Sequence, residues 1–243
     1  MENETIEATG IGQLVAKDER LAAIFEKYGI DYCCHGDHTL ADAVKQAGAD
    51  VAAVKNDIEA LTAKTESSGA AIDFTSWPLD LIADYIEKKH HRYVAAQSPV
   101  LQTYLEKLCR VHGTNHPELA EVRDLFNQSV GELAMHMKKE ELMLFPMIRR
   151  MVAAGNSGPQ RQGPAISAVV QKMTEEHEQE GERFSKIRAL THDYSVPADG
   201  CNTYRITMGL LHDFEKDLHR HIHLENNILF PGAIAMENDL NRL

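Results

Sequence analysis

One eleven-residue pattern occurs twice in this chain, 85 residues apart. The first copy begins at His136 and the second at His221, and both read His-x3-Glu-x3-Leu-Phe-Pro. In each copy the histidine and the glutamate are four residues apart, so on an α-helix they share one face, one turn apart. The repetition predicts a duplicated helical hairpin in which His136 and Glu140 correspond to His221 and Glu225.

Four long segments show the periodicity of helices, and none shows the sustained alternation expected of a strand. Turn-forming Gly, Pro and Asn residues separate the segments, and each Phe-Pro pair is expected to end a helix. The segments span 78–111, 117–150, 164–192 and 203–230. Long helices joined by short loops predict an all-α fold built on an antiparallel four-helix bundle.

A small helical domain is expected before the bundle. Residues 1–66 contain short apolar helical patterns around a polar loop, Asp31-Tyr-Cys-Cys-His-Gly-Asp37. Residues 67–77 have the composition of a linker. The bundle would then take residues 78–243.

Both repeats fall on apolar stripes. The stripe of the second repeat contains Phe214, Leu218, His221, Glu225 and Ile228. The stripe of the first contains Leu133, His136, Glu140, Met143 and Met147. A carboxylate in an apolar core is costly unless a positive charge compensates it, so two such carboxylates, each beside a histidine, predict a bound cation.

A duplicated hairpin requires one matching ligand from each of the other two helices. His177 lies 44 residues before His221, and His91 lies 45 residues before His136. Antiparallel pairing therefore places each near the height of its partner, so that four histidines and two glutamates meet in one layer. His90 competes with His91: spacing favours His91, whereas periodicity favours the stripe Ile82, Ile86, His90 and Val94.

Imidazole and carboxylate donors fit iron and exclude a structural zinc site built on cysteines. Six ligands are too many for one open mononuclear site, and two bridging glutamates with two terminal histidines per ion suit a pair of irons. With an oxo or hydroxo bridge each iron would have about five ligands. At least one position would stay open for a small molecule.

Other polar residues of the bundle are weaker candidates for the metal site. Glu132 and Glu176 lie near predicted ligands and are interpreted either as groups that support them or as surface charges. His219 and His223 are expected on the solvated helix surface. At about 1.5 Å per residue, His112 lies about 30 Å from His91, too far to contribute to the same site.

Cys33 and Cys34 are adjacent in the polar loop. They are interpreted either as a functional thiol pair, redox-active or metal-handling and open to thiolate formation, or as two loop thiols without a role. Cys109 and Cys201 receive no role.

Composition narrows the function classes. The formal net charge of −12 argues against nucleic-acid binding, which requires a positive surface. No apolar run approaches the roughly 20 residues that span a bilayer, and the acidic first residues do not resemble a signal peptide. Four cysteines do not form a disulfide scaffold in a chain of this size. A cytoplasmic protein that binds neither nucleic acid nor membrane is expected.

The motifs resemble those of a known family. The bundle resembles the hemerythrin-like domain, and the leading segment is similar to the small domain that precedes it in the di-iron proteins that repair iron–sulfur clusters. The resemblance covers about residues 10–232. It rests on Asp-Tyr-Cys-Cys-x-Gly at 31–36, His-His-x-Tyr at 90–93, Val-His-Gly-x-x-His-Pro-Glu-Leu at 111–119, His-Met-x-Lys-Glu at 136–140 and Leu-Glu-Asn-Asn-x-Leu-Phe-Pro at 224–231.

This resemblance implies which residues bind the metal and in which cellular conditions the protein acts. The second histidine of the His-His pair matches the family ligand, which supports His91. The remaining ligand positions fall on His136, Glu140, His177, His221 and Glu225. The resemblance also implies a cytoplasmic, often dimeric protein, made under nitrosative and oxidative stress, that restores damaged iron–sulfur clusters.

Three functional hypotheses follow. The first is repair of damaged iron–sulfur proteins, by iron donation or nitric oxide chemistry at a di-iron centre, with Cys33-Cys34 docking the client or supplying electrons. The second is a carrier or sensor of dioxygen or nitric oxide. The cysteine-containing domain weighs against it, because a carrier needs only the bundle. The third is an enzyme that reduces nitric oxide.

Overall fold

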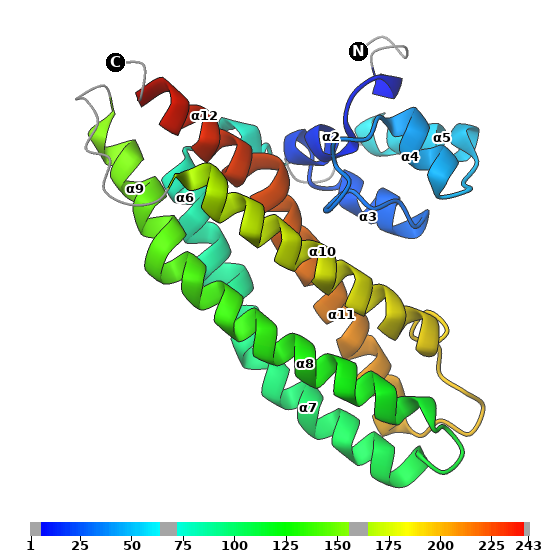
Figure 1. Ribbon diagram of the computed structural model, residues 1–243. Helices are drawn as coiled ribbons and strands as arrows, with labels where there is room; N and C mark the ends of the chain where they lie inside the picture. The colour runs from blue at the N-terminus through cyan, green and yellow to red at the C-terminus, as the bar shows by residue number, and fades with distance from the viewer. Residues whose placement is uncertain (1–5, 64–71, 156–164, 241–243) are drawn as a thin grey trace. The chain divides into compact units, whose positions relative to one another are not determined.

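The computed structural model describes residues 6–63, 72–155 and 165–240. Within these ranges every extended regular element is a helix, and the one β-bridge joins Gly10 to Thr39 (Figure 1). The predicted all-α fold is therefore confirmed. Of the predicted linker 67–77, residues 67–71 lie outside the described residues.

The chain divides into two compact units. The first contains Met1–Ile82, Ala154–Gln160 and Arg220–Leu243, and the second contains Ala83–Ala153 and Arg161–His219. Two continuous helices, α6 (Leu79–Tyr85) and α11 (Asn202–Leu224), each contribute residues to both units.

The second unit is a helical bundle whose core is centred on one aromatic ring. Its helices are α7 (Arg92–His112), α8 (Glu118–Lys139), α10 (Ile166–Leu190) and most of α11, which run alongside one another in Figure 1. Phe214 of α11 is fully buried and contacts one ring from each of the other three helices. The ring centroids lie 6.1 Å away for Tyr93, 5.2 Å for Phe126 and 5.7 Å for Phe184. Aromatic pairs at these separations stabilise a core beyond the area that they bury.

The first unit contains four short helices of the N-terminal segment together with α12. The helices are α2 (Ile11–Lys17), α3 (Leu21–Lys27), α4 (Leu40–Gln46), α5 (Val51–Ala63) and α12 (Phe230–Leu240), with a 3-10 turn, η2, at Phe74–Ser76. Gly29 ends α3 in a left-handed conformation with φ of 66°, which an L-residue adopts only at a cost. Phe25 and Val44 are fully buried between these helices.

Three of the long helices are interrupted by a π-helical turn. These turns are η3 (Ile86–His91), η4 (Glu140–Leu144) and η5 (Glu225–Leu229). A π turn contains an extra residue and shifts every later side chain relative to the α-helical repeat. Each of the three contains a predicted ligand: His91, Glu140 or Glu225.

Because of this shift, the predicted apolar stripes are wrong for the residues that follow Glu140 and Glu225. In the first repeat Met143 is exposed and Met147 is half-buried, whereas Leu144 and Phe145 are fully buried. In the second, Ile228 is half-buried, and the core positions that replace it are Leu229 and Phe230. An α-helical wheel drawn through either glutamate therefore misses the following core residues by one position.

The prediction that the Phe-Pro pairs end their helices is also wrong. After η4 the chain continues as α9 (Phe145–Ala154), and after η5 it continues as α12. Pro146 and Pro231 each occupy the second position of the helix that follows the π turn. Each proline therefore lies within a continuous helical run, and its missing N–H removes one backbone hydrogen bond where the π turn passes into the α-helix.

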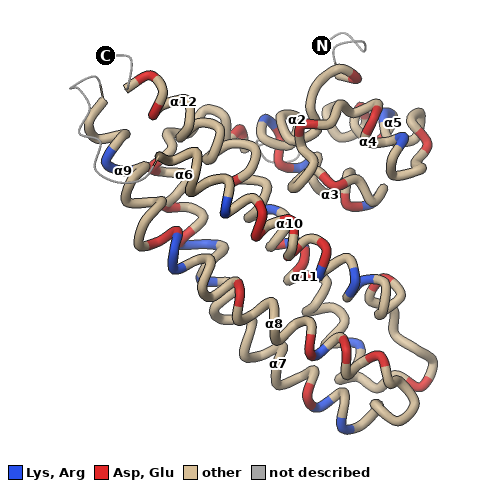
Figure 2. The backbone as a smooth tube through the Cα atoms, in the orientation of Figure 1, with Lys and Arg blue, Asp and Glu red and all other residues tan. Residues whose placement is uncertain are grey.

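Acidic and basic side chains are interspersed along α10 (Figure 2). No helix within the described ranges combines the length and the hydropathy needed to span a bilayer.

Candidate metal centre

Glu140 lies between two imidazoles, and each of its oxygens faces a different one. Its Oε1 lies 3.3 Å from Nε2 of His136, and its Oε2 lies 3.3 Å from Nε2 of His91. Nε2 of His177 lies 3.1 Å from Nε2 of His136. The Glu140 side chain is 0% exposed, so it carries its carboxylate into the interior of the second unit.

The second repeat has the same local arrangement. Nε2 of His221 lies 3.2 Å from Oε1 of Glu225, one turn along the chain. Both side chains are buried, and that of Glu225 is 0% exposed. Each repeat thus places one buried carboxylate against the imidazole four residues before it.

Two groups of four side chains place one potential ligand atom each within 4.8 Å of the others. One contains His91, Glu140, His221 and Glu225, and the other contains His136, Glu140, His177 and Glu225. The two glutamates belong to both groups, and each group adds two histidines of its own. Buried carboxylates and neutral imidazoles form a donor set that suits iron, and burying two carboxylates together requires a compensating positive charge.

The π turn η3 resolves the competition between His90 and His91. Both are buried, but Nε2 of His91 faces Glu140, whereas Nδ1 of His90 lies 3.0 Å from Oδ1 of Asp217. Across η3 the step from Ile86 to His91 takes five residues, where an α-helix would take four. The local stripe therefore favoured His90 only because it assumed an uninterrupted α-helix.

Carboxylates hold the outer nitrogens of two of these imidazoles. Nδ1 of His136 donates to Oε2 of Glu176 over 2.8 Å, and Nδ1 of His91 donates to Oε1 of Glu141 over 2.8 Å. These bonds orient Nε2 of each ring inward as a lone-pair donor. The hydrogen bond from His136, with that from Lys139, lowers the pKa of Glu176 to about 2, so Glu176 is ionised at neutral pH.

Comparison with known proteins connects this geometry to a family. Residues 83–233 match the Hemerythrin HHE cation binding domain, and residues 7–62 match a Domain of Unknown function, DUF542. The chain is 32% identical to iron-sulfur cluster repair protein YtfE of Yersinia pestis (strain Pestoides F), over 93% of this chain and 97% of that protein. It is 29% identical to iron-sulfur cluster repair protein ScdA of Staphylococcus haemolyticus, over 94% and 97% of the two chains.

The chain belongs to the family of iron-sulfur cluster repair proteins. The resemblance found in its motifs is therefore confirmed over nearly its full length. The two groups of potential ligands contain, between them, the six positions expected as ligands. Glu176 supports a histidine, as one of its two interpretations held. Glu132 pairs with Arg183 over 2.8 Å.

One expectation about this family member is wrong. His223 does not lie on a solvated surface: it is buried, and its ring centroid lies 5.4 Å from that of Tyr32. Burial lowers its pKa to about 4, so the imidazole is neutral at pH 7. A helical wheel of the bundle alone could not reveal this contact, because it is made with the N-terminal segment.

The side chains that follow Glu225 hold the cysteine loop. Nδ2 of Asn226 donates to the carbonyl of Cys33 over 3.2 Å, and Nδ2 of Asn227 donates to the carbonyls of Tyr32 and Cys33 over 3.2 and 3.3 Å. This role was not predicted, and the one signal for it in the sequence is that the Asn-Asn pair has no counterpart in the first repeat.

A second polar cluster lies at the far end of α7. Nε2 of His112 lies 3.2 Å from Sγ of Cys201, the residue before α11. The hydrogen bond with His112, helped by the backbone amides of Tyr204 and Thr203, lowers the pKa of Cys201 to about 7. Sequence spacing gave no indication of this pair, because its members are 89 residues apart.

Proposed function

We propose that this protein repairs iron–sulfur clusters damaged by nitrosative or oxidative stress, and that a di-iron centre in its bundle carries that activity. The observation that supports this most is the sharing of Glu140 and Glu225 between two four-residue groups. A carboxylate common to two sets of donors suits a pair of bridged ions rather than one.

In this proposal His91 and His221 would hold one iron, and His136 and His177 would hold the other. Glu140 and Glu225 would bridge them, with an oxo or hydroxo group as a further bridge. Iron in such a site supplies redox chemistry and a binding position for a small ligand such as nitric oxide or dioxygen. The protein's own part is to keep the imidazoles oriented through Glu141 and Glu176 and to exclude bulk water from the carboxylates.

The partners would be damaged iron–sulfur proteins, met by a homodimer in the cytoplasm. The names of the relatives support repair, and the alignments reach 97% of their length. A simple carrier or sensor of dioxygen or nitric oxide is not favoured, because the chain also matches the N-terminal domain of those relatives. The division into residues 1–66, a linker 67–77 and a bundle 78–243 belongs to the same proposal.

Iron content tests the centre. Purified His221→Ala and Glu225→Ala should each lose most of the iron bound by the wild type, whereas Asp217→Asn, which changes the partner of His90, should retain it. Full iron loading in both ligand variants would contradict the assignment.

Reactivation of a cluster enzyme tests the function. The iron-loaded wild type should restore activity to a dehydratase whose cluster has been damaged by nitric oxide, and Glu225→Ala should not. If Cys33→Ser/Cys34→Ser retains its iron but fails to reactivate the enzyme, the thiol pair acts in repair. If the wild type fails to reactivate the enzyme although it is fully loaded with iron, the repair function is wrong.

A further inference from the structure

The cysteine loop brings three potential metal ligands together in the first unit. One ligand atom each from Asp31, Cys33 and Cys34 lies within 4.8 Å of the others. The two Sγ atoms are 3.7 Å apart. Two thiolates bound at about 2.3 Å to one tetrahedral ion would be separated by about 3.8 Å. The sulfurs are therefore already spaced for one shared ion.

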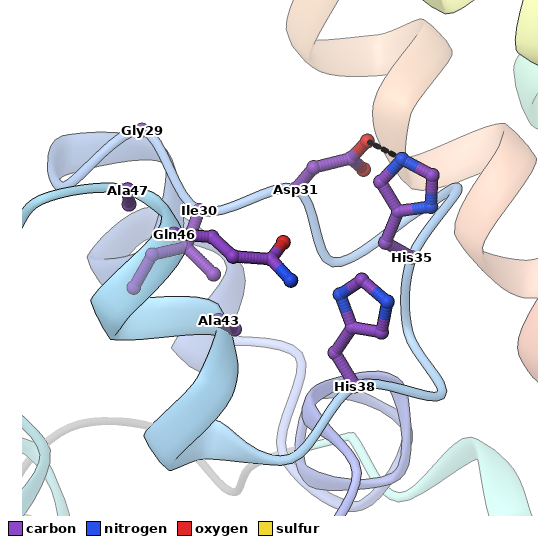
Figure 3. A pocket seen from close by; sticks show the side chains of 8 residues that line it. All are labelled: Gly29, Ile30, Asp31, His35, His38, Ala43, Gln46 and Ala47. Atoms are coloured by element: carbon purple, nitrogen blue, oxygen red, sulfur yellow. Dashed lines mark ion pairs between the residues drawn. The ribbon is translucent and has the colours of Figure 1, made fainter.

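Asp31 organises this loop with one oxygen and leaves the other toward the outside. Its Oδ1 accepts hydrogen bonds from the backbone amides of Cys33 and Cys34 over 3.1 and 2.9 Å, and from the Cys33 thiol over 3.1 Å. Its Oδ2 lies 3.9 Å from Nε2 of His35 (Figure 3). A nitrogen donor thus lies beside the carboxylate of Asp31.

A small pocket opens beside Asp31 of this cluster. Its volume is about 150 Å³, and Asp31, His35 and His38 are among the residues that line it. Figure 3 shows the imidazole of His35 beside Asp31, and that of His38 next to His35. Cys33 is buried and Cys34 is half-buried, while the side chains of Asp31 and His35 are 44% and 55% exposed. The carboxylate of Asp31 and the half-buried Cys34 are therefore accessible to solvent.

We propose that Asp31, Cys33 and Cys34, with His35 as the fourth donor, form a second metal site that takes one thiophilic divalent cation of the class of Zn²⁺ or Fe²⁺. Two sulfurs, one carboxylate oxygen and one imidazole nitrogen make a tetrahedral donor set typical of such ions. Binding releases the protons of the two thiols to solvent and involves no change of oxidation state. The site does not depend on the repair function.

The backbone of this site is held before any ion binds. Asn226 and Asn227 bind the carbonyls of Tyr32 and Cys33, and Gly12 and Gly36 leave space for the Asn227 side chain. A Cβ at Gly36 would lie 2.7 Å from Cγ of Asn227. The asparagines follow Glu225 directly, so η5 connects the thiol loop to a proposed ligand of the bundle centre. Fixed donors bind more tightly because less ordering is required on binding.

Titration with Co²⁺ distinguishes this site from the bundle centre. The full-length protein, with its bundle centre loaded with iron, is titrated anaerobically under reducing conditions with Co²⁺ as a probe. A thiolate-to-Co²⁺ charge-transfer band should appear and saturate at one equivalent, because the bundle centre offers no sulfur. Zn²⁺ should displace Co²⁺ and abolish the band.

Variants assign the band to the loop. Cys34→Ser, at a half-buried position, should abolish it, and Asp31→Asn or His35→Gln should weaken binding at least about tenfold. Cys201→Ser should leave the band unchanged, and it is the matched control because Cys201 is an exposed thiol beside an imidazole, that of His112, outside the loop. Unaltered circular dichroism and iron content in each variant would show that the fold and the bundle centre are intact.

Two results would overturn the proposal. One is the absence of a charge-transfer band in the wild type, and the other is a band of full intensity in Cys34→Ser. Either result would leave the iron content of the bundle and the reactivation assay unaffected, so the failure of this site is separable from the failure of the proposed function.

Discussion

The two copies of the repeat have matching buried residues and differ in the residues that face outward. In both, a buried glutamate opens a π turn and a Leu-Phe pair returns to the core. On the outer edge of η4, Glu141 binds His91, and Leu142 is 75% exposed. The equivalent residues of η5 are Asn226 and Asn227, which are half-buried and hold the cysteine loop.

The same contrast extends one turn back along each helix. The position of Lys138 in the first repeat is that of His223 in the second. Lys138 is exposed, whereas His223 is buried against Tyr32. Inward positions of the two repeats must present the same donors, so they cannot diverge without losing the site. Outward positions are not bound by this requirement, and the second repeat uses them to dock the N-terminal segment.

Removing the metal tests whether the interiors are equivalent, and we expect the largest effect here. With the cation chelated at about pH 8, where free imidazole is neutral, Glu140 and Glu225 remain buried without a compensating charge. The free energy of unfolding should fall by about 3–5 kcal/mol, which corresponds to a Tm lower by about 6–20 °C. Thermal unfolding with and without chelator measures this.

Neutral variants show whether the two halves share that cost. In the metal-free protein, Glu140→Gln and Glu225→Gln should each recover a similar part of the lost stability, because each removes one buried charge. Recovery in only one of them would show that the interiors are not equivalent. A Glu132→Gln control, at a residue paired with Arg183 outside the cluster, should recover nothing.

The sequence predicts the features of this structure that depend on regular helix geometry, and it does not predict those that depend on packing. The helices and the six grouped positions could be predicted, because i,i+4 spacing and the heights of antiparallel helices depend only on regular geometry. The π turns could not, because a π turn has no local propensity signal. In η4 and η5 it forms where the glutamate and the following Leu-Phe pair all face the core, which four α-helical steps cannot achieve. The predicted stripe failed at Met143 and Ile228 for this reason.

Contacts between segments that are far apart in the sequence could not be predicted either. The predicted solvent exposure of His223 was wrong because the apolar face of its own helix points in another direction. The N-terminal segment covers the face that carries His223. An uninterrupted α-helix would turn Glu141 away from His91, so regular helix geometry does not predict their hydrogen bond. Nothing along the chain links Cys201 to His112, so their contact could not be predicted.

The buried His223 should give the second repeat a pH dependence that the first lacks. Its pKa is lowered to about 4 by burial, whereas an unfolded histidine titrates near 6.5. Between these values the unfolded chain binds a proton that the folded chain does not, so stability falls as pH falls through the window. The loss attributable to His223 should reach about 2 kcal/mol at about pH 5.

Denaturant unfolding at about pH 7.5 and about pH 5 measures that loss in the wild type and in His223→Gln. The comparison between the two proteins cancels the contributions of other titrating groups, including the histidines of the metal centre. The variant should lose about 2 kcal/mol less than the wild type over this interval. Lys138→Gln, at the equivalent position of the first repeat, should behave as the wild type does. Equal losses in all three proteins would mean that the burial of His223 has no energetic consequence.

The smallest effect concerns the close approach of η5 to the cysteine loop. Gly36→Ala should destabilise the protein by about 1–3 kcal/mol, because the new methyl group overlaps Asn227. Asn227→Ala should cost about 1–2 kcal/mol, because the carbonyl of Tyr32 loses its Asn227 donor and that of Cys33 keeps only Asn226 of its two asparagine donors. The double variant should lose less than the sum, since removal of the Asn227 amide makes space for the methyl group.

Gly131→Ala, in α8 with nothing within 4 Å of the added Cβ, should instead stabilise by up to about 1 kcal/mol. Leu142→Ala, the first-repeat counterpart of Asn227→Ala, should change stability by less than about 0.5 kcal/mol. Strictly additive losses at positions 36 and 227 would show that this contact does not distinguish the second repeat from the first.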